Sequence, residues 1–333
     1  MKRIRRRQFL LAAGSLLAAP LAHGQQPGRN YRVGALFVGG AAATDQYRSA
    51  LRDRLASHGF VEGRNLKIDS RGATGQFHED REVARELLAA KPDAIFTSSI
   101  RVTEAAQAAT KSVPIVFTWI GDPVATGLVK SYARPGGNVT GVTNRFGELL
   151  LKRLELAREL VPRAKRVAVV GDPVGMQSNV YESIAPALRK AAAQLGVELL
   201  EITAKGRGAA WDEAIARAKD GGAVAVLPFA RFNDQPVAGE GVVQATNQLR
   251  IPALFADAET VERGGLISLG TNLVDDVRRG ADLLARVLKG AKPAELPVDQ
   301  AARFELVVNL KTAKALGIKI PQSVLLRADR VIE

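Results

Sequence analysis

Short apolar runs alternate with longer helical patterns along the first half of this chain. Four runs of roughly four to seven apolar and β-branched residues predict buried strands at 31–37, 66–70, 94–98 and 115–119. The segments between them predict helices over 44–58, 78–90 and 102–111. The first helix ends at Gly59, a residue typical of the position just past a helix C-terminus.

The same alternation restarts after a Pro/Gly-rich passage at 133–143. Strands are predicted at 166–171, 197–202, 223–229, 252–256 and 266–270, and helices at 147–160, 179–195, 209–219, 239–248 and 273–288. Strand-helix-strand units with short connections favour parallel sheets covered by helices on both faces. Two such blocks in succession predict an α/β protein with two similar lobes.

The first 24 residues follow a different pattern. Five basic residues precede an apolar run of about 14 residues, and small residues end at Gly24. A bilayer-spanning helix needs about 20 apolar residues, so we predict a cleaved signal peptide over 1–24. Arg6 and Arg7, followed by Gln8, Phe9 and Leu10, resemble the twin-arginine signal, which exports folded proteins. Ordinary secretion of an unfolded chain remains the alternative.

Charge and cysteine content refine this prediction. The net charge of +13 falls to +8 when the five basic residues of the signal are removed. The remaining Lys and Arg alternate with Asp and Glu along the helices, and aromatic residues make up 5%, a pattern that does not indicate a nucleic-acid partner. The chain has no Cys, which excludes disulfides and a lipid-modified cysteine. We expect a monomer in the periplasm, without a lipid anchor.

The sequence does not contain the residues or motifs that several common kinds of catalytic centre require. Beyond the signal there are two histidines, His58 and His78, and no H-E-x-x-H, G-x-S-x-G, P-loop or G-x-G-x-x-G motif follows a predicted strand. Zinc or redox metals, nucleotide cofactors and a Ser-His-Asp triad are therefore not expected. Binding without catalysis, and without a cofactor, is the prediction.

Candidate binding residues follow the strands of the first half, where doubly wound sheets collect ligands. Thr44 with Asp45, and Ser98 with Ser99, fall at predicted helix N-termini, whose free N–H groups suit an anionic group. Simple helix capping explains the same positions. Trp119 would form the wall of a pocket for an apolar or aromatic group, or belongs to the core.

Matching positions follow the strands of the second half. The candidates are Asp172, Ser178, Phe229, Arg231 and Asp257. Asp122 would pair with an amine, and Arg231 would bind a carboxylate through its forked guanidinium, unless it is simply solvated. Asp122 and Asp172 lie in two similar segments of the sequence, 120–127 and 170–177. Both segments contain Gly-Asp-Pro, which is also a common turn sequence without any binding role. Carboxylates together with serine N–H groups suit a zwitterion such as an amino acid.

Four long segments resemble a known family. They are GDPVATGLVKSYARPGGNVTGVT (121–143), LKRLELARELVPRAKRVAVV (151–170), LRIPALFADAETVERGGLISLG (249–270) and FELVVNLKTAKALGIKIPQSVLLRADRVIE (304–333). They are similar to the ABC-transporter substrate-binding proteins that include tryptophan- and tyrosine-binding members. The resemblance covers essentially the whole mature chain.

The resemblance implies the type 1 periplasmic-binding-protein fold, in which two Rossmann-like lobes joined by three hinge strands close on a solute and dock on a membrane permease. The implied N-terminal lobe is 30–141 plus about 272–289, and the implied C-terminal lobe is 142–270 plus about 298–333. GNVTGV (137–142) would be the first hinge crossing, since glycine suits a hinge.

This sequence also departs from the family. Gly171-Asp172-Pro173 replaces the usual Asn-Pro pair, and the loop at 229–241 is unlike that of other members. Solute identity is therefore what the resemblance fixes least. The expected function is that of a solute receptor for an ABC importer, and the alternative is a sensory protein that presents its ligand to a chemoreceptor or histidine kinase.

Overall fold

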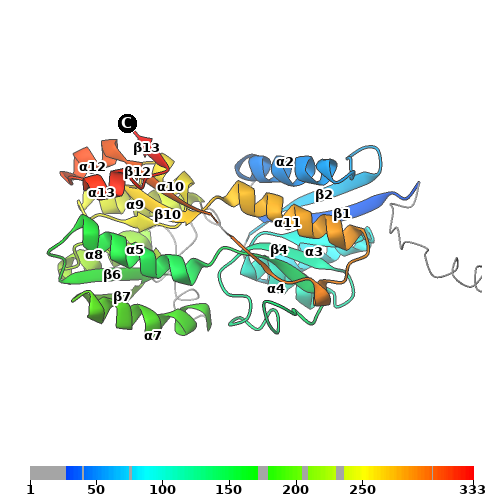
Figure 1. The fold of residues 1–333 in the computed structure, drawn as a ribbon, viewed down its shortest axis with the longest axis horizontal. Coiled ribbons are helices and arrows are strands. Elements are labelled where there is room, and N and C mark those ends of the chain that lie inside the picture. The colour runs from blue at the N-terminus through cyan, green and yellow to red at the C-terminus, as the bar shows by residue number, and fades with distance from the viewer. Residues whose placement is uncertain are drawn as a thin grey trace, which may run out of the picture.

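Figure 1 shows the computed structural model of the chain, in which two α/β lobes lie side by side and are joined by crossing segments. The structure describes residues 28–39, 41–74, 77–171, 179–204, 209–229, 236–301 and 303–333. The predicted signal peptide lies outside these residues. In the described part of the chain, no helix combines the length and apolar character needed to cross a membrane. Within the same residues, no three His, Cys, Asp or Glu side chains are grouped to hold a metal ion.

The N-terminal lobe is built on a six-stranded parallel sheet in the order β11-β5-β4-β3-β1-β2. The strands are β1 (Tyr31–Val38), β2 (Leu66–Ala73), β3 (Ala94–Thr97), β4 (Ile115–Ile120), β5 (Val139–Thr143) and β11 (Asp299–Gln300). Helices α2 (Ala41–Ser57) and α11 (Leu273–Leu288) cover one face, and α3 (Phe77–Ala89) and α4 (Ile100–Ala109) cover the other. Both faces are buried, as parallel sheets require.

The C-terminal lobe combines two sheets, β7-β6-β8 and β13-β12-β10-β9, that meet at a bridge between Val226 and Ala253. Its strands are β6 (Arg166–Gly171), β7 (Glu198–Thr203), β8 (Val226–Phe229), β9 (Leu254–Phe255), β10 (Ile267–Thr271), β12 (Phe304–Asn309) and β13 (Arg330–Ile332). One face carries α5 (Phe146–Leu160), α7 (Asn179–Gln194), α12 (Leu310–Leu316) and α13 (Gln322–Leu325), and the other carries α8 (Ala209–Asp220), α9 (Pro236–Gln248) and α10 (Ala258–Glu262). A short 3-10 turn at Pro293–Glu295 precedes β11.

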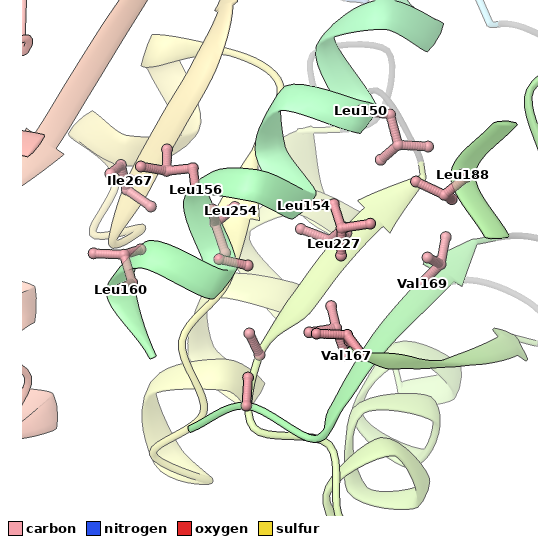
Figure 2. Close-up of a cluster of buried hydrophobic side chains, with 14 of the residues drawn as sticks. Leu150, Leu154, Leu156, Leu160, Val167, Val169, Leu188, Leu227, Leu254 and Ile267 are labelled. Atoms are coloured by element: carbon pink, nitrogen blue, oxygen red, sulfur yellow. The ribbon is translucent and has the colours of Figure 1, made fainter. Parts of the chain in front are cut away.

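Alternation along β6 sends its side chains into both cores of this lobe. Val167 and Val169 pack in the cluster that contains α5, whereas Ala168 and Val170 pack beneath α8 and α9. Figure 2 shows the first cluster, where leucines of α5 lie over Val167, Val169 and residues of β8 and β9. The apolar stripe of α5 therefore fixes the helix to its sheet.

Three segments connect the lobes, after β5, after β10 and after β11 (Figure 1). Two of them touch where the Arg145 guanidinium lies 5.2 Å from the Phe304 ring centroid. The second and third touch where Asn272 Nδ2 donates to Glu305 Oε2 at 3.4 Å. The connecting segments are thus packed against one another.

The predicted strands and helices of both halves are confirmed, with local corrections. The first helix begins at Ala41 instead of residue 44, so the predicted start was wrong. Strand β2, predicted as buried, is an edge strand in which six of the eight residues are partly or fully exposed. The elements from β11 to β13 were not predicted from periodicity, and β12 runs antiparallel to β10 in an otherwise parallel lobe.

Helices α2 and α11, far apart in sequence, are joined by a carboxylate. Asp282 accepts from Arg54 Nε at 2.7 Å and Nη2 at 3.0 Å, and His58 Nε2 lies 2.5 Å from its Oδ1. Burial by itself would raise the pKa of Asp282, but the hydrogen bonds from Arg54 and His58 outweigh it and lower that pKa below 3.8. The contact therefore stabilises the fold above about pH 4 and loses its effect as pH falls through the lowered value.

We expect Asp282→Asn to lower the melting temperature by up to about 3 °C at pH 7, because partly exposed ion pairs contribute up to about 1 kcal/mol. The difference from wild type should shrink as the pH falls through the lowered pKa of Asp282, because the acid is then protonated in both the folded and the unfolded state. Differential scanning calorimetry across pH 3–7 would measure it. Asp53→Asn, which removes an exposed carboxylate of α2, is the control and should show no such pH dependence. An Asp282→Asn deficit that does not shrink toward the acid end of this range would contradict the assignment.

Candidate functional site

Three aromatic rings gather at the carboxyl ends of β1 and β4 in the N-terminal lobe. Trp119 meets Tyr47 edge-on with ring centroids 4.6 Å apart, and Phe37 lies 6.2 Å from Trp119 and 6.4 Å from Tyr47. Trp119 Nε1 donates to the Leu273 carbonyl at 3.2 Å, so the start of α11 is tied to the same place. Phe37, Tyr47 and Trp119 are called the N-terminal ring cluster.

The backbone of Trp119 is strained. Its φ is +63°, in the left-handed region that large L-residues rarely adopt, and the pairing of β4 with β5 shifts register between Phe117 and Ile120. Such conformations cost about 1–3 kcal/mol and persist where the surrounding structure imposes them, often at functional sites. The bulge turns the indole into the ring cluster at the strand end.

A second set of three rings occupies the corresponding edge of the C-terminal lobe. The ring of Phe229, the last residue of β8, meets two other rings edge-on. Its centroid lies 5.2 Å from that of Phe146 at the start of α5 and 4.8 Å from that of Tyr181 near the start of α7. All three side chains are buried. Phe146, Tyr181 and Phe229 are called the C-terminal ring cluster.

One hydrogen bond joins the two lobes at these edges. Tyr47 Oη of the N-terminal ring cluster donates to Glu259 Oε1 of α10 at 2.8 Å. Burial and the nearby negative charge of Asp257 raise the pKa of Glu259, and the hydrogen bond from Tyr47 offsets part of the effect. The strand ends of the two lobes therefore face one another across a contact that involves a half-buried carboxyl group.

The predicted anion-binding residues of the N-terminal lobe have local structural partners. Ser99 is the N-cap of α4, as predicted, and accepts from Val102 N at 3.4 Å. Ser98 does not cap the helix, because its Oγ accepts from Val38 N at 2.9 Å and so ties β1 to β3. Thr44 is buried in the first turns of α2, and neither it nor Asp45 stands at the helix start. Asp45 is exposed and pairs with Arg48.

Asp122 is also engaged within its own lobe. Its Oδ1 accepts from Val124 N and Ala125 N at 3.0 Å each and from Tyr132 Oη at 3.1 Å. This is the turn chemistry that a Gly-Asp-Pro sequence permits, and pairing with an amine through the other oxygen remains a prediction. Trp119 is buried like a core residue and yet stands at the edge that faces the other lobe.

Among the predicted residues of the C-terminal lobe, Phe229 and Asp257 are described. Asp257 is the N-cap of α10, and its Oδ1 accepts from Thr260 N at 2.9 Å and Thr260 Oγ1 at 2.7 Å. Asp172, Ser178 and Arg231 lie outside the described residues. The structure thus brings Trp119 and Phe229 to the facing edges of the two lobes, with Asp257 in the turn that leads to Glu259.

The sequence matches the family model for "ABC transporter substrate binding protein" over residues 35–332. The chain belongs to this family. The match confirms the resemblance seen in the sequence and runs through both lobes, so the architecture is the type 1 periplasmic-binding-protein fold. This is a family of substrate-binding proteins, which agrees with the prediction that the chain binds a small molecule.

Known relatives of this substrate-binding protein include receptors for aromatic amino acids. The chain is 28% identical over 275 residues to the tyrosine-binding protein of Clostridioides difficile, covering 83% of this chain and 77% of the relative. It is 26% identical, with a TM-score of 0.80, to an ABC domain in complex with L-Trp from Streptococcus pneumoniae, covering 91% of this chain and 100% of that one.

A solved open form allows a comparison of lobe arrangement. The ligand-free, open structure of a substrate-binding protein with adhesive properties from Clostridium difficile is 25% identical and covers 91% of this chain and 99% of that one, with a TM-score of 0.66. At nearly equal identity, this substrate-binding protein superposes better on the tryptophan-bound structure than on the open one. The contact between Tyr47 and Glu259 fits an arrangement in which the lobes are close together.

Sequence reasoning missed Tyr47, Glu259, Phe146 and Tyr181. Each stands inside a helical pattern, where an aromatic or acidic residue carries no distinctive spacing. Their positions in the chain were the one usable signal. Tyr47, Phe146 and Tyr181 fall in about the first two turns of helices that follow a strand or a hinge segment. The pairing of Tyr47 with Glu259 across the lobes, and of Phe146 and Tyr181 with Phe229 within one lobe, depends on the fold and not on local sequence.

We expect Glu259→Gln to raise the melting temperature of this substrate-binding protein at pH 8 and to have little effect at pH 4. The raised pKa means that Glu259 favours the folded state below pH 4.5 and that this stability is lost as pH rises through the folded value. Glutamine keeps an acceptor for Tyr47 without the buried charge. Glu262→Gln, an exposed neighbour paired with Arg330, is the control. A drop in stability at pH 8 would refute the expectation.

Proposed function

We propose that this protein is the solute receptor of an ABC importer and that its lobes close around a free amino acid or a related carboxylate with an apolar or aromatic body. The observation that carries the proposal is the pair of ring clusters at the strand ends of the two lobes, together with the hydrogen bond from Tyr47 of one lobe to Glu259 of the other. Aromatic walls with a few fixed polar groups are typical of small-molecule sites. The tyrosine- and tryptophan-binding relatives support the same class of solute.

Closure requires hinges, and we propose them at the three connecting segments. We keep the lobe bounds inferred from the sequence, 30–141 plus 272–289 and 142–270 plus the tail, with two adjustments. Because β5 runs to Thr143 in the first sheet, we place the first crossing after Thr143. Because β11 pairs with β5 in the first sheet, we place the last crossing after Gln300. The contacts of Arg145 with Phe304 and of Asn272 with Glu305 would let the segments turn together.

The cellular part of the proposal rests on the sequence. The twin-arginine-like signal would deliver the folded protein to the periplasm, where it would act as a monomer without a lipid anchor. There the closed, loaded form would dock on a membrane permease, and no catalytic step or cofactor is required. A sensory role would need the same binding step, so binding is the first property to test.

Native mass spectrometry of the protein purified gently from periplasm should show a mass excess over the denatured chain, corresponding to a captured solute. A thermal-shift screen of the free amino acids should give a matching increase of several degrees, since ligand at 100 times Kd stabilises by about 2.7 kcal/mol. No captured mass together with no shift from any amino acid would refute the proposed solute class.

Intrinsic fluorescence offers a site-specific test because the chain has two tryptophans. Trp119 stands in the N-terminal ring cluster, whereas Trp211 of α8 is buried in the core on the far face of the other lobe. Titration with L-leucine should change the emission of Trp211→Phe, in which Trp119 is the reporter. Trp119→Phe should show no change, and a response carried by Trp211 would contradict a site between the lobes. If L-leucine does not bind, the amino acid selected by the screen replaces it.

A further inference from the structure

A buried guanidinium in the C-terminal lobe has no anionic partner among the residues that the structure describes. Arg153 of α5 is fully buried, yet within the described residues its Nη1 and Nη2 atoms have no hydrogen-bond acceptor. Its Nε donates to the Leu149 carbonyl at 3.3 Å. Burial lowers the pKa of Arg153 to about 9, and the negative charge of Asp257 offsets part of that effect, so the group is still a cation at neutral pH. An unpaired buried charge is costly, and native structures usually pair such a group with an anion.

The side chain of Arg153 points toward the hinge. Leu149 lies one turn before Arg153 on α5, and the guanidinium carbon lies 4.7 Å from the ring centroid of Phe146, the first residue of the helix. In Figure 1, α5 begins beside the segments that cross between the lobes. Through Phe146, the guanidinium is next to the C-terminal ring cluster.

The carboxylate of Asp257 does not satisfy this cation. Asp257 influences Arg153 electrostatically, but in the described part of the chain Arg153 forms no ion pair within 4.0 Å, and Asp257 Oδ1 already accepts two hydrogen bonds from Thr260. Asn144, just before α5, has a buried side-chain oxygen without a hydrogen-bond donor among the described residues. Within the same residues, α5 and the segment before it therefore carry donors without an acceptor and an acceptor without a donor.

We propose that Arg153 binds the carboxylate of the solute, with its two Nη groups forming a forked pair of hydrogen bonds. A carboxylate matches a guanidinium in shape and charge, and such bidentate pairs are among the stronger hydrogen bonds in proteins. This inference rests on the proposed function and deepens it, because it makes the solute a carboxylate that enters while the lobes are apart and is enclosed with Arg153. The oxygen of Asn144 would accept from the ammonium group of an amino acid.

The test pairs each acid with its neutral amide. Isothermal titration would give the affinities of L-tyrosine, L-tryptophan and L-leucine and of their carboxamides for the wild type and for Arg153→Met. The wild type should prefer the acid by about 100-fold, and Arg153→Met should reduce the preference below about 5-fold. Arg153→Lys, which keeps the charge without the fork, should retain about a 10-fold preference. Arg158→Met, a half-buried arginine on the same helix, should leave the preference unchanged.

Stability without solute separates this role from a structural one. If the missing partner of Arg153 is the solute, Arg153→Met should melt within about 2 °C of the wild type, or higher, because replacing an unpaired buried charge by an apolar side chain is neutral or stabilising. A fall of about 6 °C or more would indicate an anionic partner inside the chain and would overturn the inference.

The possible failures can be told apart. If the wild type binds the amino acids and Arg153→Met keeps the full preference for the acid, the Arg153 assignment is wrong and the proposed function stands. If sugars or polyols such as glucose or myo-inositol bind in place of every acid, the carboxylate class is wrong although the protein is a receptor. If nothing binds, the proposed function fails and the inference fails with it.

Discussion

Gly141→Ala is expected to destabilise the N-terminal lobe by at least about 3 kcal/mol, enough to leave much of the protein unfolded or insoluble. Gly141 pairs with Phe117 across β4 and β5, and an added Cβ would lie 2.2 Å from the Phe117 carbonyl oxygen and 2.5 Å from its Cγ. Phe117 is fully buried, so neither the strand nor the ring has room to move. The two strands would have to separate at the point where the chain leaves the lobe.

Urea unfolding followed by circular dichroism would measure this effect. Gly137→Ala is a matched control from the same ARPGGNVTGV segment, because a Cβ there has no atom within 4 Å and the backbone has no positive φ. We expect the control to stay within about 0.5 kcal/mol of the wild type. A Gly141→Ala protein as stable as the control would show that β4 and β5 do not approach as closely as described.

Trp119→Ala should cost about 3–5 kcal/mol, the usual range for removing a large buried aromatic side chain. The change removes the edge-on contact with Tyr47, the hydrogen bond to the Leu273 carbonyl and one side of the N-terminal ring cluster. Amino-acid binding should fall with stability, because Tyr47 would lose the ring that positions it for Glu259. Thermal unfolding with and without L-leucine would report both effects.

The positive φ of Trp119 gives this position a second signature. Glycine adopts left-handed backbone readily, whereas alanine pays about 1–2 kcal/mol there, so Trp119→Gly should be at least as stable as Trp119→Ala. At Phe117, two residues earlier on the same strand, the backbone has no positive φ and glycine should be the worse substitution. If the alanine variant is more stable than the glycine variant at both positions, the left-handed conformation at Trp119 is refuted.

The parts of the fold that could be predicted are the helices and strands whose apolar positions repeat with a regular local period. Helix α11 begins and ends at the predicted residues, because Asn272 caps it and its apolar face repeats without interruption. Strand β6 also agrees at both ends. The start of α2 was misjudged because Ala41 to Ala43 have neither a capping side chain nor a polar face to mark a boundary.

The tail could not be read in this way, because β12 and β13 obtain their register from β10 and from each other. The site was predictable only as a location. Residues at strand ends could be listed, and Trp119 and Phe229 do stand at the facing edges, but Ser98 and Asp122 are used by their own lobe. Tyr47 and Glu259 contact each other although they are more than 100 residues apart in the sequence. Arg153 stands out because, among the described residues, its Nη1 and Nη2 atoms have no hydrogen-bond acceptor. No short window of sequence contains either fact.

The late position of α11 and β11 in the sequence has a consequence for biosynthesis. Leu273, Val277 and Leu284 of α11 complete the core beneath β1 and α2, and β11 pairs with β5. Most of the second lobe, from α5 to β10, is nevertheless translated between β5 and α11. At about 5–20 residues per second, the first lobe waits on the order of ten seconds or more on the ribosome with its apolar face uncovered. We therefore expect the nascent chain to bind a chaperone. In a polypeptide truncated after residue 270, the first lobe would be unable to finish folding.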